Sequence, residues 1–219
     1  MTDAAGQSSD RALERLLAGY VAGTLRPPLH VLVASHLALA PESRVLVRKL
    51  EAARGAALES AEPQPVSKRG EKLAAIFAAQ RGDVSASEAQ PDEVLPEPLA
   101  RYLGASLGEI RWRTLVPGLK EHRVDTVGHG EAMLYWVRPG RKMLTHTHDG
   151  PEYTLVLKGG FRDIGGHYRR GDIAIAEPEI EHGPQADEDQ DCICYTVSDA
   201  PLRLVGPVGR IVQWLSRRA

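Results

Sequence analysis

The residues of this chain that are best suited to chemistry lie in the segment 140–159, which reads G-x5-H-x-H-x3-E-x6-G. Successive side chains of a strand point to opposite faces, so His146 and His148, two positions apart, project from the same face. The Gly150–Pro151 corner then turns the chain and can aim Glu152 at the same point. Imidazoles and carboxylates are ligands of first-row transition metals. The motif therefore predicts a divalent metal site with open coordination positions.

A fourth ligand must come from another part of the chain, and His182 is the best candidate. It follows the strand-like residues 172–176 and Pro178, which places it one hairpin away from the first three ligands. Three histidines and one carboxylate suit zinc, iron, manganese or nickel, and leave one or two positions for water or substrate. Our first expectation is one zinc ion. The alternative is a polar pocket that holds a small ligand or water in place of a metal.

Two cysteines, Cys192 and Cys194, are the only ones in the chain. They share one face of an expected strand, and a disulfide between residues so close would be strained. One interpretation makes them small buried hydrophobic residues. The other makes them a redox-sensing pair, and both interpretations remain open at this point.

The elements that must position these residues change character along the chain. Helical spacing of apolar residues runs through 10–57 and returns in 67–80, whereas residues 81–98 are acidic and rich in proline, as in a linker. After a short helical piece near 99–103, the apolar period falls to two, which is typical of a β-sandwich or barrel. The strand-like segments are 133–137, 153–157, 172–176, 192–197 and 210–214.

Composition narrows the function classes. The chain has 219 residues and a net charge of −2, which gives no reason to expect direct nucleic-acid binding. No apolar run reaches membrane-spanning length, and residues 1–10 lack the apolar core of a signal peptide. We therefore expect a cytoplasmic protein that does not bind membranes.

The metal motif resembles that of the cupin family, whose small β-barrel carries His, His and Glu in its first motif and a third His in its second. The first motif matches here at every fixed position. The second departs from the general pattern, because Ile180 stands where glycine is usual and His182 comes one residue early after Pro178. The resemblance implies His146, His148, Glu152 and His182 as the ligand set.

Residues 17–25, the following helix with His36, and residues 101–120 resemble the ChrR family of anti-sigma factors. The resemblance implies an α+β multidomain protein: a small all-α domain at 1–81, a linker at 82–98, and an all-β cupin (double-stranded β-helix) barrel at 99–219. It also implies that residues 1–81 bind an extracytoplasmic-function sigma factor. The cupin would then sense a small molecule or an oxidant.

One departure from the ChrR family concerns its helical zinc site, which carries H-x3-C-x2-C. Here His36 is present, but the next two positions are Ala40 and Ser43, and Arg11 stands near the place of a further histidine. Alanine has no donor atom and a serine hydroxyl is a poor zinc ligand. We therefore predict a helical domain without metal, held together by its apolar stripes.

Two functions follow from these features. The first is a transcriptional regulator, an anti-sigma factor that sequesters its sigma factor and responds through the cupin metal. The alternative is a metal-dependent, dioxygenase-like cupin enzyme with a helical appendage. No residue outside the metal ligands indicates a substrate for such an enzyme.

Overall fold

The N-terminal third is helical, as the sequence predicts. The computed structural model describes residues 3–79, 92–127, 130–178, 180–200 and 203–205. Its first helices are α1 (Asp3–Ala22), α2 (Pro27–Leu39), α3 (Pro41–Glu59) and α4 (Arg69–Ala78). Both α2 and α3 begin with proline. Its fixed φ suits the first turn, and its lack of an N–H costs nothing there, because an N–H at this position has no partner within the helix. No helix among the described residues is long and apolar enough to cross a membrane.

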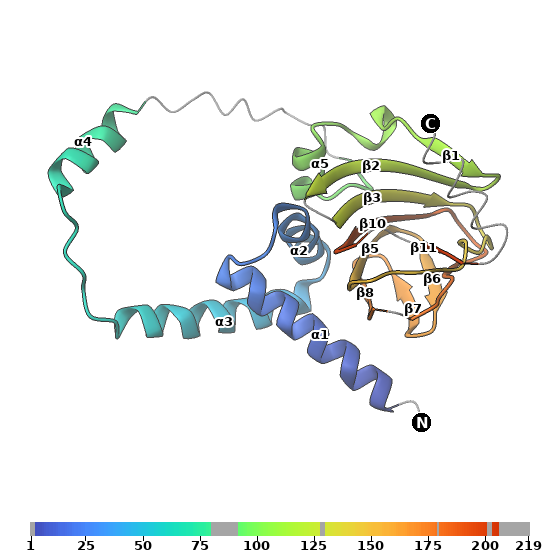
Figure 1. Ribbon diagram of the computed structural model, residues 1–219, viewed down its shortest axis with the longest axis horizontal. Coiled ribbons are helices and arrows are strands. Elements are labelled where there is room, and N and C mark those ends of the chain that lie inside the picture. Colours follow the sequence, from blue (N-terminus) through green and yellow to red (C-terminus); the bar gives the residue numbers. More distant parts are fainter. Residues whose placement is uncertain (1–2, 80–91, 128–129, 179, 201–202, 206–219) are drawn as a thin grey trace.

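The first three helices and α4 differ in their surroundings. Helices α1, α2 and α3 pack on one another, and α1 and α2 also contact the β-sheet. Helix α4 stands apart from the rest of the molecule, at the end of an extended segment that follows α3 (Figure 1). It has no buried residue.

The C-terminal part is a β-structure preceded by α5 (Glu97–Leu103) and the 3-10 turn η1 (Leu107–Glu109). Its strands are β1 (Arg113–Val116), β2 (Leu119–Val127), β3 (Gly130–Val137), β4 (His146–Thr147), β5 (Glu152–Lys158), β6 (Gly160–Asp163), β7 (Gly166–Arg169), β8 (Ile173–Ala176), β9 (Gln185–Ala186), β10 (Cys192–Ser198) and β11 (Arg203–Leu204). A six-stranded antiparallel sheet, ordered β1-β2-β3-β10-β5-β8, faces the smaller sheets β7-β6-β9 and β11-β4 (Figure 1). Four of the five predicted strands lie within β3, β5, β8 and β10, whereas 210–214 is outside the described residues.

The two faces of strand β10 pack into two different hydrophobic cores. Cys192 and Cys194 belong to the core between the sheets, whereas Ile193, Tyr195 and Val197 belong to the core shared with the helices. This is the alternation of a strand with both faces covered. Tyr195 is fully buried and its hydroxyl donates a hydrogen bond to the Pro28 carbonyl, 3.2 Å away.

The helices and the sheet are joined by one continuous apolar core. Leu17 of α1 and Leu32 of α2 share a cluster with Leu155 of β5, and all three are at most 1% exposed. The last residues of the segment expected to be a linker also belong to this cluster, because Leu95 is buried and α5 begins at Glu97. Helices α1–α3 are therefore packed onto the barrel.

Candidate metal centre

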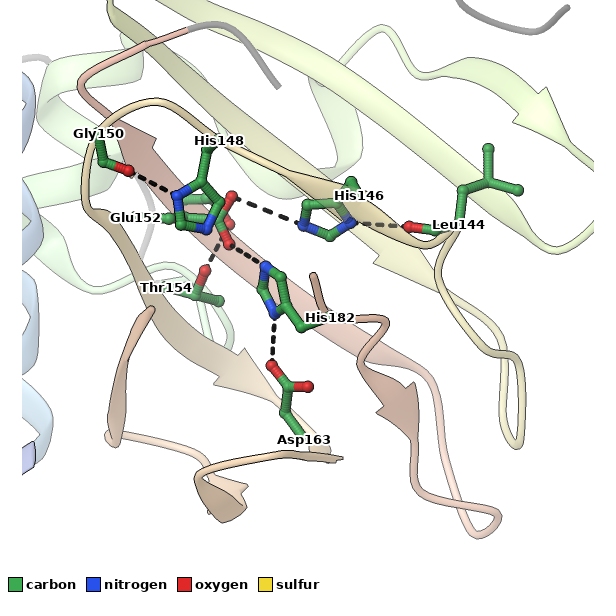
Figure 2. Close-up of polar contacts among 9 residues, drawn as sticks. Leu144, His146, His148, Gly150, Glu152, Thr154, Asp163 and His182 are labelled. Atoms are coloured by element: carbon green, nitrogen blue, oxygen red, sulfur yellow. Dashed lines mark hydrogen bonds and ion pairs between the residues drawn. The ribbon is translucent and has the colours of Figure 1, made fainter. Parts of the chain in front are cut away.

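Three of the predicted ligands meet inside the barrel. His146 Nε2 lies 3.9 Å from Glu152 Oε2, and His182 Nε2 lies 3.9 Å from Glu152 Oε1 (Figure 2). Within the described part of the chain, these residues form the only His/Cys/Asp/Glu group whose ligand atoms all lie within 4.8 Å of one another. His148 is outside that limit, but its ring centroid is 5.4 Å from that of His182.

Backbone pairing explains how residues 36 positions apart come together. His146 and His182 form an antiparallel bridge in which each N–H donates to the other residue's carbonyl at 3.0 Å. Glu152 begins β5, which follows the Gly150–Pro151 corner. A side chain on Gly150 would collide with Asp199, so this corner requires glycine. The corner thus brings Glu152 back to face the two histidines.

Hydrogen bonds determine the tautomer of all three imidazoles, that is, which ring nitrogen carries the proton. The Nδ1 of His146 is 2.7 Å from the Leu144 carbonyl, and that of His148 is 2.5 Å from the Gly150 carbonyl (Figure 2). A carbonyl can only accept, so Nδ1 carries the proton, and in the neutral ring Nε2 presents a lone pair. His182 Nδ1 is 2.6 Å from the Asp163 carboxylate and has the same tautomer.

The residues fit a metal ion because the Nε2 atoms have no other partner. In His146, His148 and His182, Nε2 is buried without a hydrogen bond. Burying an unpaired polar atom is unfavourable, and the 3.9 Å separations from Glu152 are too long for hydrogen bonds. A divalent cation among these groups would satisfy all of them, and the donor set suits zinc or another first-row metal.

The charges agree with a cation site. Burial alone would raise the pKa of Glu152, but His146, His182 and His148 outweigh it and hold the pKa below its usual range. Burial likewise opposes the protonation of His146, yet Glu152 and the Leu144 carbonyl raise the pKa of this imidazole above its usual value. The pKa shift therefore favours an ionised Glu152, and a cation at this place would compete with a proton for His146.

One functional residue was missed by sequence reasoning. Asp163, at the end of β6, holds His182 in place, and its own pKa is lowered by that imidazole despite partial burial. It lies 19 positions from His182, and no spacing rule links the two residues. Only the pairing of the strands reveals the contact.

The two cysteines lie at the wall of the same cavity as Glu152 and His182. Their Sγ atoms are 3.5 Å apart and both side chains are buried. The neighbouring Cys192 and burial raise the pKa of the Cys194 thiol well above its usual value. A thiol held in its protonated form is a weak nucleophile, which favours the packing interpretation over the redox interpretation.

The degenerate site of the helical domain is a hydrogen-bonded cluster. His36 Nε2 is 2.8 Å from Ser43 Oγ, and its Nδ1 is 2.6 Å from the Gly171 carbonyl. Both ring nitrogens are therefore engaged, and Ala40 adds no donor atom. The absence of metal from this domain remains a prediction.

The fold and the site define a class of protein: a helical domain packed onto a cupin barrel with a buried His/Glu group that could hold a metal ion. Residues 103–201 match the family described as the ChrR Cupin-like domain. The anti-sigma-E factor ChrR of Cereibacter sphaeroides is 39% identical over 202 residues, which is 91% of this chain and 94% of that protein. The chain belongs to the ChrR family.

Two other comparisons extend this result. The crystal structure of Rhodobacter sphaeroides SigE in complex with the anti-sigma ChrR aligns with a TM-score of 0.72 and 38% identity, over 85% of this chain and 96% of the matched chain. Dimethylsulfoniopropionate lyase DddW of Ruegeria pomeroyi is 36% identical over 94 residues, 41% of this chain and 59% of that protein.

Proposed function

We propose that this chain is a cytoplasmic anti-sigma factor. Its helical residues 1–81 bind an extracytoplasmic-function sigma factor, and its cupin binds one divalent metal ion and responds to a signal. Binding inhibits the sigma factor by covering the surfaces it uses, so the mechanism needs no chemical change in that partner.

The observation that carries this proposal is the exposed apolar surface that runs from the end of α3 through α4. Leu58 of α3, Val66 of the connecting segment, and Ile76 and Phe77 of α4 are 76%, 57%, 67% and 84% exposed, respectively. An amphipathic helix that leaves its apolar side chains in water is typical of a surface that a partner covers. Helix α4 stands clear of the barrel and has no buried residue, so its apolar side chains are accessible to a partner (Figure 1).

The comparisons support the same conclusion. The relative that matches nearly the whole chain is named an anti-sigma factor, and the aligned crystal structure holds ChrR together with SigE. The dioxygenase-like alternative is not favoured, since the match to a lyase covers 41% of this chain, whereas the match to an anti-sigma factor covers 91%.

The test is co-purification of the full-length chain with the extracytoplasmic-function sigma factors of its host. We expect one stable complex, and Ile76→Asp should abolish it. Ile164→Asp is the matched control, because Ile164 is 71% exposed in the cupin and Ile76 is 67% exposed. Retention of the complex by both variants, or its absence from the wild type, would refute the proposal.

We assign the metal to His146, His148, Glu152 and His182, with zinc as the expected ion. The imidazoles offer Nε2 lone pairs, Glu152 offers its charge, and Asp163 orients His182. When bound, the ion supplies a Lewis-acidic position for water or a signal molecule.

A further inference from the structure

The barrel contains a cavity that begins at the metal residues and reaches the helical domain. Its volume is about 250 Å³. Glu152, His182 and Thr154 line its polar end, and Phe161, Val137 and Met143 are among its apolar walls. For comparison, an apolar protein cavity of about 150 Å³ holds benzene, so this one has room for roughly ten non-hydrogen atoms.

The lining of the cavity includes a residue of the helical domain, Ala12 of α1. Ile164, from the turn between β6 and β7, and Ile180 also line the cavity, and their exposed fractions of 71% and 39% indicate that they lie at its mouth. Helix α1 packs against β8, whose Ala174 and Ile175 also line the cavity. An occupant of the cavity would therefore touch α1 directly.

The charges of the lining restrict the occupant. The described lining residues include three carboxylates, Glu152, Asp163 and Glu177, and no lysine or arginine. A cationic head group would meet the divalent ion assigned to Glu152 and His182, and like charges repel at short distance. The hydroxyls of Thr154 and Thr196, 3.1 Å apart, can instead serve a neutral oxygen group.

We propose that this cavity binds a mainly apolar molecule of roughly ten non-hydrogen atoms with one oxygen head group at its end. The oxygen lies at the polar end near His182 and Thr154, and the apolar body extends past Phe161 to Ala12. This inference deepens the proposed function, on which it rests for its biological meaning. It names the chemical class of the signal and the helix that the signal touches.

The test uses 1-octanol as the probe and calorimetric titration of the metal-loaded, full-length protein without a sigma factor. Octanol should bind at least about a hundredfold more tightly than ethanol, because each buried methylene multiplies affinity about fourfold. Octylammonium, with the same body and a cationic head, should bind at least about tenfold more weakly than octanol. Equal or tighter binding of octylammonium, or equal binding of ethanol and octanol, would overturn the proposal.

Variants of the lining residues test the role of α1. Ala12→Phe should reduce octanol affinity at least about tenfold by filling part of the cavity, whereas Ala18→Phe, at an exposed position on the same helix, should leave it unchanged. Ile180→Asp, at a mouth residue 39% exposed, provides a second variant that should fold normally and weaken octanol binding. If both Ala12→Phe and Ile180→Asp bound octanol as tightly as the wild type, octanol would not bind next to these residues and the proposal would be wrong. Because no sigma factor is present, this outcome is distinct from failure of the anti-sigma proposal.

Discussion

His36 and Ser43 are hydrogen-bonded at the position where the ChrR family has part of its helical zinc site. Since Nδ1 of His36 donates to the Gly171 carbonyl, its Nε2 accepts from the Ser43 hydroxyl, 2.8 Å away. Gly171 lies in the turn before β8, and His36 is 3% exposed. This pair therefore links α2 and α3 to each other and to the barrel.

Replacing Ser43 by alanine should destabilise the protein by about 1–3 kcal/mol, because the buried Nε2 of His36 would lose its partner. Denaturation by urea, followed by circular dichroism, measures the change. Ser60→Ala is the control, since the Ser60 hydroxyl also forms a hydrogen bond but lies on an exposed surface. Equal stability of the Ser43 and Ser60 variants would show that the buried hydrogen bond contributes nothing.

Stability should depend on the protonation of His36. Burial lowers its pKa below 6.5, although the Gly171 carbonyl, Glu42 and Asp172 oppose the shift. The unfolded chain then binds more protons than the folded one just below pH 6.5, so the stabilisation is complete above that pH and is lost as the pH falls through the folded-state pKa.

The measurement compares the free energy of unfolding of wild type and His36→Gln between pH 5 and pH 8. The other titrating groups are common to both proteins, so the difference reports His36 alone. We expect the difference in free energy of unfolding between the wild type and His36→Gln to become smaller as the pH falls. A difference that is constant over this range would contradict the assigned shift.

Metal content should be one equivalent per chain and should depend only on the cupin. His146→Ala and Glu152→Ala each remove a ligand and should lose most of the metal, whereas His36→Ala should keep one equivalent. Elemental analysis of the purified proteins gives the answer. Two equivalents in the wild type would mean that the helical domain also binds metal.

The order of helices followed by strands was predicted from the sequence and is confirmed, and His146, Glu152 and His182 lie together in the structure. Periodicity and motif spacing allow this because they are local properties. The linker and the role of these residues as metal ligands remain predictions. The contacts of Asp163 with His182 and of His36 with Gly171 depend on strand pairing and domain packing, which join residues far apart. Strands β5 and β6 show the same limit, because only Gly159 separates them in the chain and yet they belong to different sheets.

The shared core predicts that α1–α3 and the barrel unfold together. Leu32 is fully buried between α2 and the sheet, so Leu32→Ala should cost about 2–5 kcal/mol. The unfolding midpoint measured by helical circular dichroism and the midpoint measured by the fluorescence of the three tryptophans, all of which follow residue 110, should then shift by the same amount. Leu58→Ala, at an exposed position of α3, should shift neither signal. Separate transitions for the two signals would show that the helical domain and the cupin fold independently.

Asp163 should control metal affinity through His182. Asp163→Asn weakens the acceptor that orients the imidazole, and loss of such a contact typically reduces metal affinity about 10–100-fold. Asp187→Asn is the matched control, because Asp187 forms a similar 2.7 Å contact with His167, which is outside the proposed ligand set. Competition with a chromogenic chelator at neutral pH compares the variants with the wild type. If both variants bind metal as tightly as the wild type, the orienting role of Asp163 is wrong; if both weaken equally, the effect is a general loss of barrel stability.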